Sequence, residues 1–111
     1  MQITHFNHLQ CVELNNDILS LLITQSVGPR VISLRYKGGE NLFAELPNFT
    51  TEAPVGTFHF YGGHRLWRAP EDLSLTYLPD DAPVEITEIE QGVRVVQPTE
   101  PTGQTSTTLR E

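Results

Sequence analysis

Apolar residues recur along this chain in short runs, and residues that favour turns separate one run from the next. Residues 30–36 alternate between apolar and polar, which places Ile32, Leu34 and Tyr36 on one face of a predicted strand. Residues 18–24 are almost continuously apolar, as expected for a strand that is buried on both faces. No long window shows the 3.6-residue period of an amphipathic helix. The pattern therefore predicts an all-β fold, built as an antiparallel β-sandwich or barrel.

Turn-forming residues divide the chain into roughly seven or eight predicted strands. Residues 15–17 and 27–29 are expected to be turns, because Asn, Asp, Gly and Pro favour turn geometry. Residues 46–56 and 72–83 are expected to be long loops. The predicted strands are residues 3–14, 18–24, 30–36, 41–45, 58–61, 84–90, 93–96 and 105–110.

Two stretches have the composition of tight hairpin turns, Lys37-Gly38-Gly39-Glu40 and Gln91-Gly92. Glycine adopts positive φ without steric cost, so Gly38 and Gly39 are the expected positive-φ positions. Gly28 precedes a proline, which favours an extended conformation, so it is expected to enter a turn or to pack closely.

Residues 58–71, FHFYGGHRLWRAPE, contain the only tryptophan, two of the four histidines and two of the seven basic residues. Their first residues predict the end of a buried strand, and Gly62-Gly63 lets the backbone turn or approach another group where a Cβ would clash. The aromatic and basic side chains that follow are expected to lie on a loop, where binding residues are commonly presented. The candidate ligand-binding residues are His64, Arg65, Trp67, Arg68 and Glu71.

Each of these side chains also has an ordinary structural explanation. Trp67 could stack on the C–H face of a sugar ring or close the core of the fold. Arg65 and Arg68 could donate to sugar hydroxyls or to a phosphate, or they could pair with acids such as Glu71. His64 could contact a ligand or bond to the backbone of its own loop.

No metal or other cofactor is expected. His59, His64, Glu71 and Asp72 match no established spacing of metal ligands. The sequence has no phosphate-binding glycine loop, dinucleotide fingerprint or nucleophile elbow. Cys11, the only cysteine, lies among apolar residues and is expected to be an inert part of the core.

Composition narrows the class of partner. The 111 residues are the length of one domain, so residues 1–111 are expected to form a single β-sandwich domain or part of one. Fourteen acidic residues against seven basic ones give a net charge of −7, which disfavours nucleic acids and anionic membranes as partners. The sequence starts without a secretory signal, and its longest apolar cluster is too short to span a bilayer. These features are typical of a cytoplasmic protein.

Three stretches together resemble the galactose mutarotase-like, or aldose 1-epimerase-like, domains. They are GPRVISL at residues 28–34, GENLF at residues 39–43 and GGHRLWRAPE at residues 62–71. The resemblance extends in order and spacing over roughly residues 10–110. It implies a supersandwich of long twisted antiparallel sheets that interconverts sugar anomers by general acid–base chemistry.

The chain also departs from that family. The arginine and the Asn-Arg pair that bind substrate there have no counterpart here, and the family's catalytic histidine and glutamate lie in later strands. We therefore assign no catalytic residue and map only residues 62–71 onto the sugar-facing surface. The expected function is binding of a hexose or related sugar by the N-terminal part of a mutarotase-like domain, without anomer interconversion by this chain alone. The alternative is a non-catalytic carbohydrate-binding or β-rich interaction module.

An incomplete sandwich would leave strand edges open. Residues 93–96 and 105–110 are the expected edges, and neither segment carries a lysine to discourage pairing with another chain. A homodimer through such edges is therefore the expected assembly.

Overall fold

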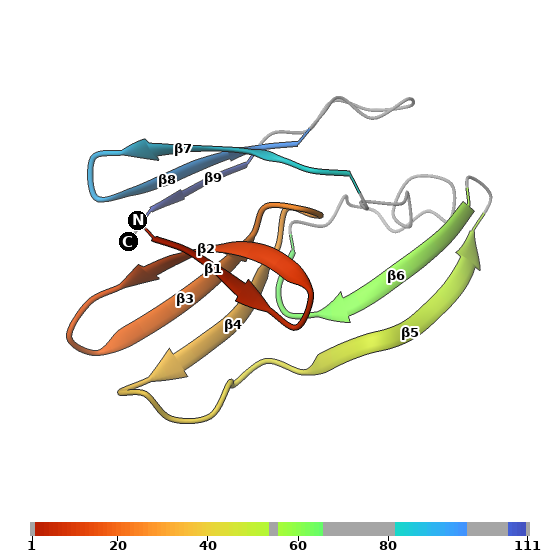
Figure 1. Ribbon diagram of the computed structural model, residues 1–111, viewed down its shortest axis with the longest axis horizontal. Helices are drawn as coiled ribbons and strands as arrows, with labels where there is room; N and C mark the ends of the chain where they lie inside the picture. Colours follow the sequence, from red (N-terminus) through yellow and green to blue (C-terminus); the bar gives the residue numbers. More distant parts are fainter. Residues whose placement is uncertain (1, 54–55, 66–81, 98–106, 111) are drawn as a thin grey trace.

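The computed structural model describes residues 2–53, 56–65, 82–97 and 107–110, and within these ranges all regular structure is β-strand (Figure 1). The predicted all-β, antiparallel fold class is confirmed. The described part of the chain contains no helix long and apolar enough to cross a membrane.

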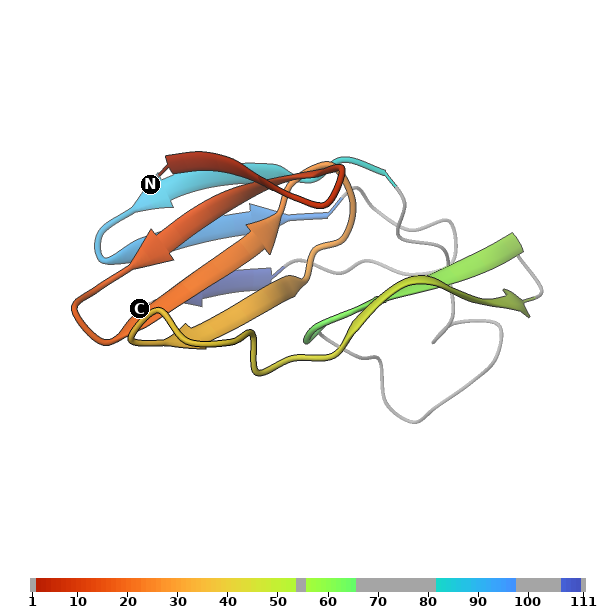
Figure 2. The same ribbon diagram turned by 60° about the horizontal axis from the view of Figure 1, so that its bottom comes forward.

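The described strands form three antiparallel sheets. The four-stranded sheet has the order β1 (Gln2–Phe6), β2 (Leu9–Asn15), β3 (Leu19–Thr24) and β4 (Val31–Tyr36). The two-stranded ribbon consists of β5 (Glu45–Ala53) and β6 (Gly56–Gly62). The three-stranded sheet has the order β7 (Glu85–Ile89), β8 (Gly92–Val96) and β9 (Thr107–Arg110). Figure 2 shows the β5–β6 ribbon extending to one side of the other two sheets.

The main core lies between the four-stranded and the three-stranded sheet. Val12 and Ile23 from one sheet share a buried cluster with Val93 and Val95 from the other. Arg94, between the two buried valines of β8, is exposed, as the two-residue period of a strand requires. Full burial of one such aliphatic side chain contributes about 1.5–3 kcal/mol, so this cluster is the main attachment between the two sheets.

A second buried cluster lies on the opposite face of the four-stranded sheet. Leu9, Cys11 and Ile32 belong to it, and Tyr61 of β6 packs against it. Desolvation by burial raises the pKa of the Cys11 thiol to about 11, so the thiol stays protonated at neutral pH. The prediction that Cys11 is a buried core residue is confirmed.

The first predicted strand, residues 3–14, is wrong as a single element, because a tight turn divides it into β1 and β2. Phe6 pairs with Leu9, and only Asn7 and His8 lie between them. Asn7 has φ of 55°, a left-handed conformation that asparagine tolerates better than most residues. The sequence lacks the Asn-Gly pair that usually marks such a turn.

The predicted return strand, residues 41–45, is also wrong. The turn before it forms as expected, because Gly39 N–H donates to Tyr36 O at 2.9 Å. Beyond the turn, however, the Asn41 side chain takes the place of a strand backbone. Its Oδ1 accepts from Leu34 N at 3.0 Å, and its Nδ2 donates to Ile32 O at 3.1 Å. A second bond to Oδ1, from Phe43 N at 3.0 Å, accompanies a bend of the backbone at residues 42 and 43.

We expect Asn41→Asp to lower the free energy of unfolding by about 1–2 kcal/mol. The aspartate keeps the acceptor for Leu34 N–H, but it loses the donor to Ile32 O and places a negative charge beside that carbonyl. Urea unfolding measures the loss, with Asn48→Asp at an exposed position of β5 as the control. The control should stay within about 0.5 kcal/mol of the parent chain. Equal stability of the two variants would contradict this role of Asn41.

Residues 46–56 do not form the predicted loop, because β5 occupies residues 45–53. The register between β5 and β6 shifts between Leu46 and Thr50. Pro47 lies in this irregular stretch, where its missing N–H does not interrupt a regular ladder. The other predicted loop, residues 72–83, lies almost entirely outside the described residues.

The second predicted hairpin is confirmed, since β7 and β8 pair around residues 90 and 91. The predicted strand at the end of the chain is also confirmed as β9. The prediction that residues 93–96 form an edge is wrong, because β8 lies between β7 and β9. Homodimer formation through a strand edge stays a prediction.

Two of the glycine predictions are wrong: Gly39 does not have a positive φ, and Gly28 does. Lys37 and Gly38 have φ of 47° and 73°, whereas Gly39 is outside the positive-φ region. Gly28 instead has φ of 113°, and a Cβ there would lie 2.6 Å from Thr24 Oγ1. The conformational bias from the following proline is therefore overridden by the tight approach of this turn to the end of β3.

Candidate functional site

The Gly62-Gly63 pair turns the chain from the end of β6 toward the start of β4. Tyr61, Gly62 and Gly63 have φ of 57°, 97° and 76°. The chain then forms an isolated bridge, in which Val31 and His64 exchange two backbone hydrogen bonds of 2.8 Å each. This bridge connects the β5–β6 ribbon to the four-stranded sheet.

The two glycines are required because other backbone segments pass against them. A Cβ on Gly62 would lie 1.9 Å from Ala44 O, and a Cβ on Gly63 would lie 2.3 Å from Val31 O. Real Cβ contacts are never this short, so only glycine fits at either position. The prediction of a close backbone approach at this pair is confirmed, and Ala44 and Val31 are the groups approached.

Arg30, just before β4, joins the same junction from the interior. Only 3% of its surface is exposed. Its Nη1 donates to Phe60 O and to Gly62 O, the latter at 3.1 Å. Its guanidinium carbon lies 5.0 Å from the centre of the Tyr61 ring, within cation–π distance. These contacts fix the arginine and the last residues of β6 relative to one another.

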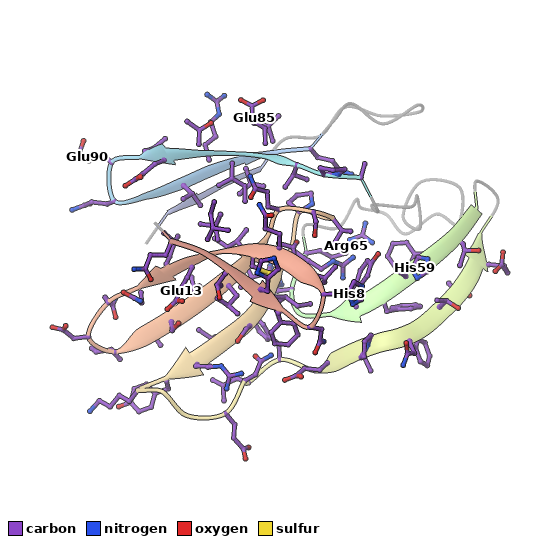
Figure 3. All side chains as sticks on the ribbon, viewed as in Figure 1. His8, Glu13, His59, Arg65, Glu85 and Glu90 are labelled. Carbon is purple, nitrogen blue, oxygen red and sulfur yellow. The ribbon has the colours of Figure 1, made fainter. Side chains whose placement is uncertain are left out.

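An open pocket of about 140 Å³ lies at this junction. Phe58 and Phe60 contribute two rings in an edge-to-face arrangement, with centroids 5.2 Å apart. The guanidinium carbon of Arg65 lies 4.8 Å from the centre of the Phe58 ring. In Figure 3, Arg65 lies where the β5–β6 ribbon meets the four-stranded sheet. The lining residues are Arg30, Ala44, Leu46, Phe58, Phe60, Gly62, Gly63 and Arg65.

The irregular stretch of β5 extends this aromatic wall to the surface. Phe49 meets Phe60 edge to face at 5.0 Å, and 58% of the Phe49 residue is exposed. Irregular strand pairing commonly redirects a side chain next to a binding site. Here it produces a continuous row of rings from exposed Phe49 through Phe60 to buried Phe58.

The sequence-predicted site residues have different outcomes. Arg65 lines the pocket. His64 is exposed and is not among the lining residues, and its backbone forms the bridge to Val31. Trp67, Arg68 and Glu71 lie outside the described residues.

Sequence reasoning missed Arg30, Phe58 and Phe60 as members of the site. The available signal for Arg30 was a charged residue directly after a Gly-Pro turn and before an apolar strand. The sequence pattern indicates for the two phenylalanines only the end of a buried strand. Their alternation with His59 places them on one face of β6, and His59 stacks instead on Tyr61 at 5.6 Å.

Of the four residues whose spacing was compared with that of metal ligands, His59 and His64 are described, whereas Glu71 and Asp72 lie outside the described residues. Within the described ranges, no three His, Cys, Asp or Glu residues lie close enough together to hold a metal ion.

Comparisons of the chain with protein-family models, with curated proteins and with solved structures found no match. The residues of the pocket are therefore the basis of the functional proposal.

Proposed function

We propose that this chain binds a hexose or related sugar, as the sugar-binding part of a carbohydrate-active, mutarotase-like domain. The pocket carries the proposal, because it combines aromatic rings with arginine donors in one recess. The resemblance of residues 28–34, 39–43 and 62–71 to mutarotase-like motifs supports the same class of ligand. Two of these stretches contribute to the pocket, through Arg30 and through Gly62, Gly63 and Arg65.

The chemistry of the lining suits a monosaccharide. A sugar ring presents C–H groups on its faces and hydroxyl groups around its rim. The half-buried ring of Phe60 offers an apolar surface to the C–H groups. The guanidinium of Arg65 offers hydrogen-bond donors to the hydroxyl groups. An enclosed cavity of roughly 150 Å³ holds one benzene ring. A pocket of about 140 Å³ that is open to solvent therefore has room for one side of a sugar ring and does not enclose a whole hexose.

The lining favours binding over proton transfer. Anomer interconversion needs a general acid and a general base, both within hydrogen-bond reach of the sugar. The described lining residues are arginines, glycines and apolar residues, with no carboxylate or imidazole among them. We therefore propose that these residues position a sugar and do not themselves exchange protons with it.

A titration with galactose and glucose tests the proposal. We expect millimolar affinity, equivalent to about 4 kcal/mol, with saturable chemical-shift changes at Arg65 and Phe60. The variant Arg65→Gln should weaken binding by about tenfold or more, because one charge-assisted hydrogen bond contributes about 1.5–3 kcal/mol. The control variant Arg94→Gln alters an exposed arginine on β8 and should leave the affinity unchanged.

Two outcomes would count against the proposed function. One is the absence of saturable changes at the pocket residues while resonances elsewhere respond to sugar. The other is an equal loss of affinity in both arginine variants, which would indicate a general charge effect. Polarimetry on the same samples should show mutarotation at the buffer rate, and a faster rate would contradict binding without proton transfer.

A further inference from the structure

The aromatic wall of the pocket continues onto one face of the β5–β6 ribbon. Successive side chains of a strand point to opposite faces, so Phe58 and Phe60 of β6 share one face. Thr51 pairs with Phe58 and therefore lies on that face as well. Phe49, two residues before Thr51, belongs to the same face, and its ring meets that of Phe60 at 5.0 Å. This face thus carries a further ring and a hydroxyl group just beyond the lining of the pocket.

The irregular pairing of β5 brings Phe49 to this position. Three residues of β5, 47–49, lie opposite the single residue Phe60 of β6. The regular pairing that resumes at Thr50 places Phe49 across from Phe60, in agreement with the contact between their rings. Bulged pairing commonly redirects a side chain beside a site, and here it adds an aromatic ring next to the pocket.

Exposure rises along this face from the pocket to the surface. Phe58 is 1% exposed, Phe60 is half-buried, and Phe49 is 58% exposed. Thr51 is exposed as well. A ligand that extends out of the pocket along the ribbon would cover the Phe49 ring, which is favourable because apolar area is removed from water.

The shape of the pocket allows such an extension. It is open to solvent and has room for one side of a sugar ring. A site of this kind leaves the rest of the ring outside, so it accepts a glycosidic link to a neighbouring sugar that an enclosed pocket would exclude. The neighbouring sugar again presents C–H groups on its faces and hydroxyl groups on its rim. Phe49 and Thr51 supply one matching surface for each.

We propose that the ligand of this site is an oligosaccharide, with one sugar ring in the pocket against Phe60 and the next ring outside it on Phe49 and Thr51. The inference rests on the proposed function, since it specifies the length of the carbohydrate that the same site binds. The C–H face of the second ring lies on the Phe49 ring, and a hydroxyl group of that sugar forms a hydrogen bond with Thr51 Oγ1. Neither contact involves a charged group, so the affinity gained from the second ring should be insensitive to salt.

A comparison of monosaccharides with disaccharides tests the proposal on the full 111-residue chain. Chemical-shift titrations compare cellobiose and maltose with glucose, and lactose with both galactose and glucose. We expect at least one disaccharide to bind about fivefold or more tightly than its component sugars, the order that one aromatic contact contributes. Resonances of Phe49 and Thr51 should shift saturably with that disaccharide, at the same dissociation constant as those of Phe60.

Variants assign the gain to the Phe49 ring. Phe49→Leu should lower the ratio of disaccharide to monosaccharide affinity toward one, because leucine keeps an apolar side chain but has no ring. Phe49→Tyr should keep the ratio. The matched control is Tyr36→Leu, which removes a ring that is 55% exposed on β4, outside the pocket, and should not change the ratio. The titrations of the parent chain need no variant, so a poorly folded variant does not remove the test.

The contrary outcomes separate this inference from the proposed function. Equal affinities for every disaccharide and its component sugars would overturn the inference and leave sugar binding intact. Tighter binding of a disaccharide without saturable shifts at Phe49 and Thr51 would place the second ring elsewhere, which also overturns the inference. No binding of any sugar would overturn both the inference and the proposed function.

Discussion

Replacing Gly62 by alanine should lower the free energy of unfolding by about 3 kcal/mol or more, as the sum of two separate costs. The first is conformational, because φ of 97° is a conformation that side chains rarely adopt. The second is steric, since the new Cβ would lie 1.9 Å from Ala44 O and 2.8 Å from Ala44 C. Both atoms belong to backbone, so no side-chain rotation relieves the overlap.

Gly38→Ala separates these two costs. Gly38 has φ of 73°, but a Cβ there would have nothing within 4 Å. It should therefore show only the conformational cost of about 1 kcal/mol. Urea unfolding of the two variants and the parent chain, analysed with a common slope, gives both values. If the two variants lose the same stability, the close approach of residues 44 and 62 is wrong.

Replacing Arg30 by methionine should cost about 2 kcal/mol net. Methionine preserves much of the apolar stem but leaves the carbonyls of Phe60 and Gly62 without this charged donor. Hydrogen bonds to charged groups contribute about 1.5–3 kcal/mol each, whereas relief of the desolvation of a buried guanidinium offsets part of that loss. We expect the loss of the hydrogen bonds to outweigh the relief of desolvation, because the two carbonyls that lose their donor belong to a buried junction.

Arg35→Met is the matched control. Arg35 lies in β4, which begins directly after Arg30, and it donates one exposed hydrogen bond to Gly39 O at 2.9 Å. Its replacement should cost less than about 1 kcal/mol. Parallel urea unfolding of both variants compares a buried arginine with a partly buried one whose hydrogen bond is exposed to solvent. An Arg30→Met chain as stable as the parent would mean that the desolvation term dominates and that Arg30 does not hold the junction.

The fold class followed from the sequence because it depends on local periodicity and turn composition. Residues 93–96 and the turn at Gln91 were predictable, since alternating apolar residues surround a short polar turn. The burial of Cys11 followed from its apolar neighbours in the same way. Patterns of this kind specify which face of a strand is buried and where it ends.

The failures have a common physical cause, which is that side-chain hydrogen bonds and irregular pairing carry no periodic signal. Asn41 binds the edge of β4 through its side chain, so an apparent return strand is absent. Pro47 argued against a strand, yet irregular pairing with β6 accommodates it inside β5. The inner position of β8 depends on β9, whose partner cannot be read from local sequence.

The candidate site was predictable only in the part that depends on local sequence. The Gly62-Gly63 pair indicated a close approach, and the basic residue after it, Arg65, lines the pocket. Arg30 is 32 residues from Gly62, to whose carbonyl it donates, and the Val31–His64 bridge brings the two segments together. Long-range contacts of this kind are not encoded by motif spacing.

The position of a bound sugar tests the central claim most directly. Intermolecular nuclear Overhauser effects between an unlabelled hexose and the isotopically labelled chain would locate the ligand. We predict contacts between sugar ring protons and the ring protons of Phe60, and none to Phe6, a partly buried phenylalanine of the second core cluster. Saturable sugar binding with contacts to other residues and none to Phe60 would contradict the assignment of this pocket as the binding site.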